Sequence, residues 1–199
     1  MFRDLLAREF SPYRTLSEQQ LDLAARHFEL LQKWNARMNL TRIESVEDVV
    51  RLHYCESFFL GAWFSAAPKR VVDVGSGAGF PGIPVAILRP DIDMTLLESN
   101  SRKCVFLRES SRDLTNVRVL NARAEQCRER FDWAVSRAVA VSEVIESGLA
   151  PNFALLVSKL DTLPKSEVID LPWGLNRVLS VSRETVSRET TIREDPSHF

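Results

Sequence analysis

The sequence predicts an α/β fold with a mostly parallel sheet flanked by helices and an N-terminal helical extension. From Arg70 onward, short apolar runs rich in β-branched residues alternate with segments of helical periodicity. A glycine-rich turn lies between the first of these runs and the helix that follows it. The region before Arg70 shows helical periodicity, which predicts that helices precede the sheet.

The first predicted helix begins at Ser17. The Ser17 side chain can cap it, Gln20 can reach back to complete a capping box, and Leu16 can pack on Leu21 as a hydrophobic staple. A second helix is predicted to begin at Ser45. Four of its apolar side chains share one face: Val49, Leu52, Phe59 and Ala62.

The two helices are expected to form a cap over residues 1–66, packed on an α/β domain over residues 67–199. Strands are predicted at 70–74, 94–98, 117–121, 131–136 and 153–158, and helices at 83–88, 102–114 and 141–149, with a short turn near 124–128. Parallel sheets of this kind bind ligands at the carboxyl ends of their strands. Four candidate site residues lie just past predicted strand ends: Gly75, Glu98, Glu125 and Arg137.

The glycine-rich turn carries the pattern D-x-G-x-G-x-G from Asp73 to Gly79. Glycine has no Cβ and accepts unusual φ angles, so backbone can approach a small molecule closely at such a turn. The candidate residues for this contact are Asp73, Gly75, Ser76, Gly77 and Gly79. Glu98 follows the next apolar run, where an acid suits a pair of ribose hydroxyls. The pattern therefore predicts a cofactor that contains adenosine.

Residues 77–82 also fit the dinucleotide pattern G-x-G-x-x-G, which by itself is a weak signal. A carboxylate at Asp73 would repel a pyrophosphate and would favour a ligand with positive charge. S-adenosylmethionine carries an ammonium and a sulfonium and no phosphate, so the sequence favours it. The alternative is a glycine turn that only packs a strand against a helix.

The charge and cysteine content exclude several classes of protein. The formal net charge is −1, although the chain has 21 arginines and five lysines, so either a local basic face or an ordinary solvated surface is possible. Cys55, Cys104 and Cys127 form no C-x-x-C pair, so neither a zinc site nor a disulfide framework is predicted, and no metal is expected. We also expect no signal peptide and no membrane span, and hence a cytoplasmic protein.

The pentapeptide Val-Ser-Arg-Glu-Thr occurs twice, at residues 181–185 and 186–190. Its β-branched alternation predicts an edge strand or a hairpin. A second hypothesis is that the repeat serves a function at the DNA level, because the genetic code allows each copy to be encoded by GTTTCACGTGAAAC plus one base. This DNA sequence is its own reverse complement and resembles a bacterial partition-centromere site.

Five segments occur in an order that makes the assignment specific. They are Trp34-Asn35-Ala36-Arg37-Met38-Asn39-Leu40-Thr41, His53-Tyr54-Cys55-Glu56-Ser57, Asp73 through Gly82-Ile83-Pro84, Arg102-Lys103 with Phe106-Leu107, and Ser136-Arg137-Ala138. Over about residues 16 to 160 the chain resembles the GidB/RsmG family of bacterial small-subunit ribosomal RNA methyltransferases. The resemblance implies a Rossmann-like class I methyltransferase fold, S-adenosylmethionine as donor and guanine N7 in 16S ribosomal RNA as acceptor.

The resemblance also implies roles for individual residues. Gly75 and Phe80 match contacts of the glycine loop with the cofactor, and the pair Ala124-Glu125 matches the residues placed at the adenine. Arg137 matches an arginine that contacts the cofactor and the substrate, and we assign it to orientation because guanine N7 has a free lone pair and needs no general base. The candidate residues on the RNA side are His53, Arg102, Lys103, Arg123 and Lys159.

The chain departs from the family pattern with Glu56 where Asp is common and with Lys159-Leu160 where the family has Lys-Gly, and its C-terminal portion is short and matches poorly. The expected partner is small-subunit ribosomal RNA or the 30S subunit, bound by a monomer. Two alternatives stay open at this point. One is a dinucleotide-dependent oxidoreductase, and the other is a non-catalytic RNA-binding factor of ribosome assembly.

Overall fold

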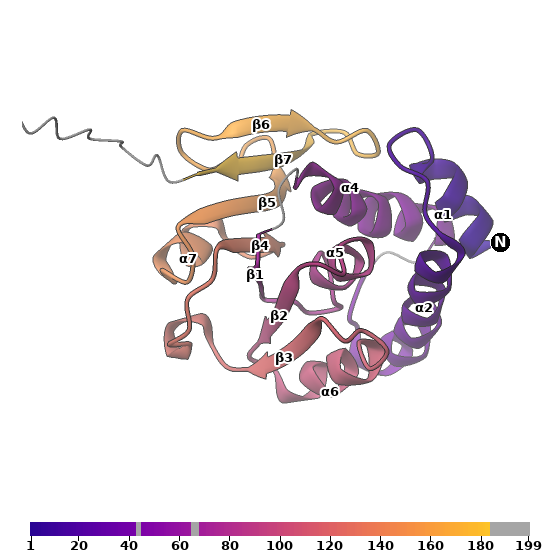
Figure 1. Cartoon of the computed structure of the whole chain (residues 1–199), viewed down its shortest axis with the longest axis horizontal. Coiled ribbons are helices and arrows are strands. Elements are labelled where there is room, and N and C mark those ends of the chain that lie inside the picture. Colours follow the sequence, from indigo (N-terminus) through magenta and orange to yellow (C-terminus); the bar gives the residue numbers. More distant parts are fainter. Residues whose placement is uncertain (43–44, 65–67, 184–199) are drawn as a thin grey trace, which may run out of the picture.

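The computed structural model describes residues 1–42, 45–64 and 68–183 and contains a seven-stranded sheet (Figure 1). The strand order is β3-β2-β1-β4-β5-β7-β6. The strands are β1 Arg70–Val74, β2 Asp93–Glu98, β3 Val117–Asn121, β4 Trp133–Arg137, β5 Asn152–Ser158, β6 Glu167–Asp170 and β7 Arg177–Ser182. β1 to β5 pair in parallel, so the predicted α/β class with a mostly parallel sheet is confirmed.

β6 and β7 form an antiparallel hairpin on the β5 edge, and the sequence analysis did not predict the strand β6. The first copy of the pentapeptide repeat begins inside β7, at Val181 and Ser182. β7 lies between β5 and β6, so the expectation of an edge strand is wrong for these two residues, whereas the alternative expectation of a hairpin is confirmed by the antiparallel pairing of β6 and β7. Residues 184–190 of the repeat lie outside the described residues.

The helices of the described chain are α1 Phe2–Phe10, α2 Glu18–Met38, α3 Val46–Asp48, η1 Val49–Cys55, α4 Glu56–Trp63, α5 Gly82–Leu88, α6 Ser101–Ser110, η2 Ala124–Gln126 and α7 Val141–Glu146. Ser17 and Gln20 form the predicted capping box at α2, with Gln20 N–H donating to Ser17 Oγ over 3.2 Å. α1 was not predicted. The predicted helices 102–114 and 141–149 end earlier, at Ser110 and Glu146.

The second predicted helix contains a π-helical segment, η1, between α3 and α4. A π turn holds more residues than an α turn, so it rotates every later side chain relative to a regular helix. Leu52, Phe59 and Ala62, which the sequence placed on one face with Val49, are therefore only partly buried. Most of the other side chains from His53 to Leu60 are buried, so this helix packs against its surroundings on more than one side.

Apolar side chains alternate between the two faces of the sheet, as strand geometry requires. Val71 and Leu156 belong to the cluster formed with the N-terminal helices and α5, whereas Val72 and Leu155 belong to the cluster that includes Val144 of α7. The N-terminal helices thus share one core with the sheet, and in Figure 1 they lie on the side opposite α7. The predicted boundary between residues 66 and 67 lies outside the described residues. Within those residues, no helix is both long enough and apolar enough to cross a bilayer.

Candidate functional site

The glycine-rich loop closes tightly over the end of β2. The N–H groups of Gly75 and Ser76 both donate to the carbonyl of Leu97, over 2.9 and 3.1 Å. Gly75 has φ +72°, and a Cβ added there would lie 2.5 Å from Val139 Cγ2. A side chain at this position would therefore be strained and would collide with the β4–α7 connection.

Two side chains of the N-terminal helices hold the same loop from behind. His27 of α2 lies 3.0 Å from the Ala78 carbonyl through Nε2, and Tyr54 Oη lies 2.7 Å from His27 Nδ1. Burial lowers the pKa of His27 to about 4, so the ring is neutral at pH 7. A neutral ring donates a hydrogen bond from Nε2 to the carbonyl and accepts a hydrogen bond from the Tyr54 hydroxyl at Nδ1. The cap thereby fixes the shape of the loop.

A cavity of about 430 Å³ opens at the carboxyl end of β1 and β2. Its lining comprises Val74, Gly75, Leu97, Glu98, Ser99, Ala122, Arg123, Ala124, Glu125, Val139, Glu143, Glu146 and Ser147. Among the predicted cofactor residues, the cavity thus collects Gly75, Glu98, Ala124 and Glu125. Arg123, predicted on the RNA side, lies in the same wall.

Glu98 anchors the cavity wall to the loop. Its Oε2 accepts the Gly77 N–H over 3.0 Å, and its Oε1 accepts the Asn100 N–H over 2.8 Å. Glu98 is 7% exposed, and each carboxylate oxygen keeps a further lone pair. The wall also carries Glu143 and Glu146 of α7, which the sequence analysis did not single out.

Asp73, Ser76, Gly77, Gly79 and Phe80 do not line this cavity. Asp73 is fully buried beneath the loop, where Oδ2 accepts the Gly82 N–H over 3.0 Å and Oδ1 has no partner. Burial raises the pKa of Asp73 to about 7. Ser76 Oγ donates to the Asp73 carbonyl, and Phe80 stacks on His53 with ring centroids 4.6 Å apart. Their direct contact with a cofactor stays a prediction.

Arg137, at the end of β4, belongs to a buried cluster of charged side chains. The Glu56 carboxylate is fully buried and accepts two hydrogen bonds from Arg177 of β7, from Nε over 3.0 Å and from Nη2 over 2.7 Å. Arg137 Nη2 lies 3.9 Å from the same carboxylate. Burial lowers the pKa of Arg137 to about 10, so its guanidinium remains charged at pH 7.

His53 completes this cluster from η1. Arg137 Nη1 contacts His53 Nδ1, and His53 Nε2 lies 2.8 Å from Thr41 Oγ1. An arginine only donates, so Nδ1 is the acceptor and the ring proton is on Nε2. Burial and the neighbouring Arg137 charge lower the pKa of His53 to about 2, so the imidazole stays neutral. With both nitrogens engaged, His53 positions Arg137 in this structure.

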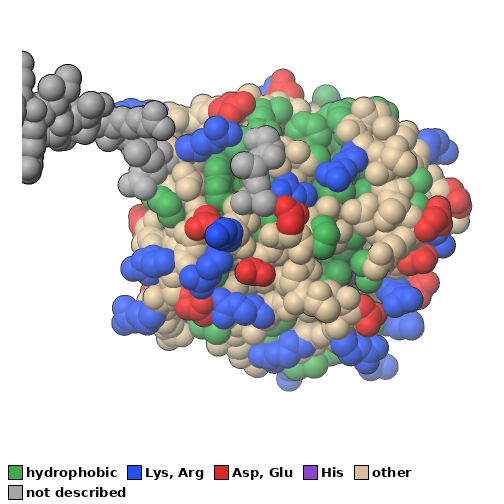
Figure 2. All heavy atoms as spheres, in the orientation of Figure 1, with side chains coloured by type: hydrophobic (Ala, Val, Ile, Leu, Met, Phe, Trp, Pro, Cys, Tyr) green, Lys and Arg blue, Asp and Glu red, His purple; other side chains and the backbone are tan. Residues whose placement is uncertain are grey.

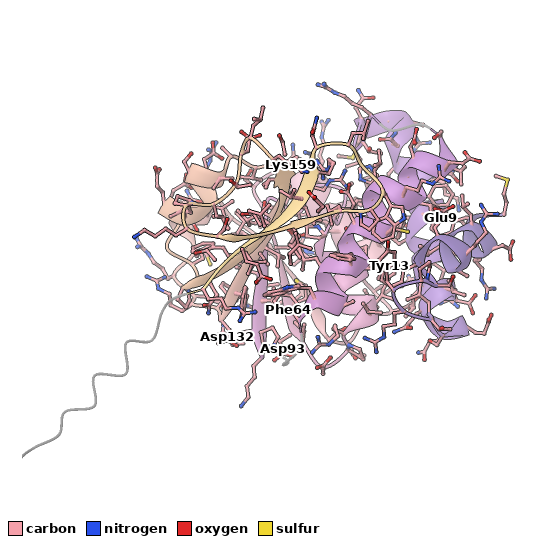
Figure 3. All side chains as sticks on the ribbon, turned by 90° about the horizontal axis from the view of Figure 1, so that it is seen from above. Glu9, Tyr13, Phe64, Asp93, Asp132 and Lys159 are labelled. Carbon is pink, nitrogen blue, oxygen red and sulfur yellow. The ribbon has the colours of Figure 1, made fainter. Side chains whose placement is uncertain are left out.

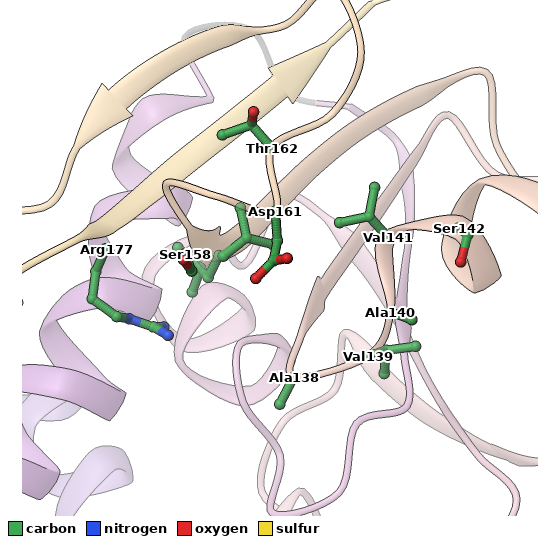
Figure 4. A pocket seen from close by; sticks show the side chains of 11 residues that line it. Ala138, Val139, Ala140, Val141, Ser142, Ser158, Asp161, Thr162 and Arg177 are labelled. Carbon is green, nitrogen blue, oxygen red and sulfur yellow. The ribbon is translucent and has the colours of Figure 1, made fainter.

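A second cavity, of about 600 Å³, lies beyond Val139, which lines both cavities. Figure 4 shows Arg177 on one side of it, Ala138 and Val139 on the other, and Asp161 between them. The sequence analysis did not predict Arg177 or this cavity. Arg177 stands 121 residues from Glu56 in the chain, so local spacing carries no signal for their contact.

The basic residues predicted to bind RNA are dispersed over the surface. Arg102 and Lys103 lie in the first turn of α6, and Lys159 pairs with Asp170 over 2.7 Å. Lys159 lies on the edge of the molecule opposite Asp93 and Asp132 (Figure 3). Blue and red side chains are interspersed on the face seen in Figure 2, so that face is not uniformly basic.

Two further arginines lie outside both cavities. Arg118 of β3 pairs with Glu129, over 2.9 Å through Nη1. Arg112 lies beyond the end of α6. Within the described residues, no cluster of His, Cys, Asp and Glu has the arrangement needed to hold a metal ion.

Comparison of the chain with known proteins shows the family to which it belongs. Residues 20–154 match the family described as "GidB: rRNA small subunit methyltransferase G". The chain belongs to the GidB family. A curated relative from Roseiflexus sp. (strain RS-1), "Ribosomal RNA small subunit methyltransferase G", is 42% identical over 63% of this chain. A relative of the same name from Chromobacterium violaceum is 39% identical over 80% of this chain and 79% of its own length.

Coverage of the GidB relatives is partial in several cases. The matched segment spans 57% of the Roseiflexus sp. protein and 51% of a Clostridium perfringens relative, little more than half of their lengths. The GidB family match ends at residue 154, before the β6–β7 hairpin that supplies Arg177.

Solved structures share the fold. The chain resembles the "magnesium protoporphyrin IX methyltransferase (ChlM) from Synechocystis PCC 6803 with bound SAM", with a TM-score of 0.57 and 12% identity over 85% of this chain and 99% of the other. A second likeness is to a "SAM dependent methyltransferase from Aquifex aeolicus", with a TM-score of 0.51 and 14% identity over 67% of this chain and 92% of the other. The predicted Rossmann-like class I methyltransferase fold is confirmed.

Replacing the Glu56 carboxylate should destabilise the protein strongly. In Glu56→Gln, two partly buried guanidinium groups lose a fully buried anion, and breaking a buried pair costs about 3–5 kcal/mol. Glu129→Gln is the matched control, because Glu129 pairs with two partly exposed arginines and such pairs contribute about 0–1 kcal/mol. Urea unfolding measures both variants. Equal losses of unfolding free energy in the two variants would contradict the buried network.

Stability should depend on pH through Asp73. Its folded pKa of about 7 lies above the unfolded value of about 3.9, so the folded state holds the proton more tightly between these values. The contribution of Asp73 to the free energy of unfolding therefore falls as pH rises from about 4 to about 7. The Asp73→Asn variant has no such pH dependence at this position. We expect the variant to gain stability relative to the wild type between pH 5 and pH 8 in urea titrations. A constant or opposite difference would contradict the burial of a proton-binding Asp73.

Proposed function

We propose that this chain transfers a methyl group from S-adenosylmethionine to N7 of a guanine in small-subunit (16S) ribosomal RNA. The observation that carries the proposal is the charge of the first cavity in a member of the GidB family. Four glutamates line it, Glu98, Glu125, Glu143 and Glu146, against the single arginine Arg123. Such a wall suits a cationic ligand without phosphate and disfavours a pyrophosphate.

The residues of the cavity fit S-adenosylmethionine in shape as well as in charge. Gly75 allows the loop to pack against Val139 of the cavity wall, where a Cβ would collide, and Glu98 keeps acceptor lone pairs beside the loop for ribose hydroxyls. Ala124 and Glu125 provide the wall for the adenine. Asp73 Oδ1 is a buried carboxylate oxygen without a partner directly beneath the loop. It favours a cation in its vicinity.

When bound, S-adenosylmethionine supplies a methyl group on a sulfonium centre. Guanine N7 has a free lone pair, so the protein need not remove a proton, and catalysis comes from orientation and electrostatics. His53 is neutral with both nitrogens engaged, which is consistent with a reaction that uses no general base. Arg137 retains donors beyond its contacts with His53 and Glu56, and we assign these to orientation of the base.

The second cavity, on the far side of Val139, is the proposed site of the guanine. Arg177 lines it and is fixed by Glu56, the carboxylate that also lies 3.9 Å from Arg137, the residue after which the cavity-lining segment Ala138–Ser142 begins. Arg102, Lys103, Arg123 and Lys159 are proposed contacts to the RNA backbone. Direct RNA contact by His53 remains a prediction, since the side chain is buried behind Arg137.

The proposal includes the setting of the enzyme. The partner is ribosomal RNA or the 30S subunit, and the acceptor implies a cytoplasmic protein. We further propose a monomer without a metal, with a helical cap over residues 1–66 and a catalytic domain over residues 67–199. A dinucleotide-dependent oxidoreductase is disfavoured by the acidic cavity. An assay of methyl transfer distinguishes the enzyme from a non-catalytic assembly factor.

Two measurements test the proposal. In isothermal titration calorimetry the chain should bind S-adenosylmethionine in preference to NAD. With radiolabelled donor it should methylate 30S particles from a strain that lacks the enzyme, and primer extension should map 7-methylguanosine. Arg137→Ala should lower kcat/KM about 100-fold, or about 2.7 kcal/mol, because it removes an orienting donor from the reaction. Donor affinity should change little.

Arg118→Ala is the matched control, because Arg118 pairs with Glu129 away from both cavities. It should leave kcat/KM within about twofold of the wild type. Preference for NAD would support the oxidoreductase. Donor binding without any methyl transfer to RNA would support the non-catalytic factor.

A further inference from the structure

Two leucines at the end of the β5–β7 ladder are almost wholly in water. Leu160 is 94% exposed and Leu175 is 97% exposed. The antiparallel register ends with the pair Ser158 and Arg177, and each leucine lies two residues beyond this last pair. The other exposed large apolar side chains within the described residues lie elsewhere, and apart from Met1 at the N-terminus none exceeds 51% exposure. The pair forms an apolar tip on an otherwise polar rim.

The backbone that carries the tip is firmly held. Lys159 N–H donates to the Asn176 carbonyl over 3.0 Å, which extends the ladder by one residue beyond the strands. Leu160 N–H donates to Ser158 Oγ over 3.2 Å, and the Lys159 ammonium pairs with Asp170. The exposure of the leucines is therefore a property of a bonded turn.

The tip borders the second cavity. Ser158 and Asp161, on either side of Leu160 in the chain, line that cavity, and so does Arg177, two residues after Leu175. Figure 4 shows Ser158, Asp161 and Arg177 together in its wall. β5 also ends at the carboxyl edge of the parallel strands, where Arg137 is the last residue of β4. The two leucines do not line the cavity themselves but lie one and two residues from side chains that do.

A guanine within an RNA stack is difficult to reach. An enzyme that acts on a base takes it out of the stack, at a cost of a few kcal/mol for unstacking. Apolar side chains such as leucine are effective wedges, because they replace part of the lost stacking when they enter between bases. Such wedges must be exposed before binding and rigidly presented, and both conditions hold at Leu160 and Leu175.

We propose that Leu160 and Leu175 form an apolar wedge that enters the RNA stack beside the target guanine and holds the base out toward the second cavity. The inference rests on the proposed function, because it takes structured ribosomal RNA as the occupant. Ser158, Asp161 and Arg177 connect the two leucines to the cavity. This connection favours stacked RNA bases as the partner of the leucines, rather than a second copy of the chain.

The test compares Leu160→Ser/Leu175→Ser with Leu160→Phe/Leu175→Phe, using 30S particles from the deletion strain and radiolabelled donor. The serine variant should lose at least about tenfold in kcat/KM, since two apolar contacts with bases are removed. The phenylalanine variant should keep most of the activity, because an aromatic ring also stacks on bases. Thermal unfolding and donor affinity should match the wild type in both, since neither leucine is buried.

Val168→Ser is the matched control on the same hairpin, because Val168 is 49% exposed and pairs with Ser180 away from the tip. It should retain wild-type kcat/KM. The wedge is overturned if the serine variant has the kcat/KM of the wild type, or if Val168→Ser loses as much kcat/KM as the serine variant. It is also overturned if the phenylalanine variant loses as much as the serine variant. It is also overturned if the wild type sediments as a dimer that the serine variant dissociates. Absence of methyl transfer by the wild type would instead refute the proposed function.

Discussion

The Glu56 carboxylate joins three parts of the chain that the sequence keeps far apart. It lies at the start of α4, accepts a two-point hydrogen bond from Arg177 of β7, and stands beside Arg137 at the end of β4. A fully buried anion is costly unless it is paired, so the N-terminal helices, the parallel strands and the C-terminal hairpin are tied to one arrangement. The same interaction fixes the positions of Arg137 and Arg177.

The rest of the site follows from this constraint and from the glycine loop. The cap holds the loop through His27 and the Ala78 carbonyl, and the loop in turn is bonded to Glu98. Arg137 is held by His53 on one side and by Glu56 on the other. The N-terminal helices that close the hydrophobic core thus also hold the glycine loop and Arg137.

Much of this arrangement was predictable because its signals are local. The capping box at Ser17, the strands β1 to β5 and the loop residue Gly75 all depend on neighbouring residues. Glu98 and Glu125 were found because parallel strands bring their carboxyl ends to one edge. The elements that were missed depend on distant partners. The π-helical segment η1 has no periodicity of its own, and β7 is buried on both faces and shows no alternation.

The missed site residues have the same explanation. Glu143 and Glu146 look like a solvated helix face until the fold brings α7 over the first cavity. Arg177 has no motif around it, and its partner lies 121 residues away. Asp73 was correctly placed at the end of a strand, but its depth beneath the loop depends on the close approach of Gly82, where a Cβ would lie 2.7 Å from Asp73 Oδ2. Depth of this kind is set by packing.

The most direct test of the central claim is a double-mutant cycle between Glu56 and Arg177, measured by urea unfolding of Glu56→Gln, Arg177→Met and the double variant. If the buried carboxylate ties the hairpin to the cap, the two losses will be strongly non-additive, with a coupling free energy of about 2 kcal/mol or more. Losses that add to within about 0.5 kcal/mol would mean that the two side chains act independently, and the account would be contradicted.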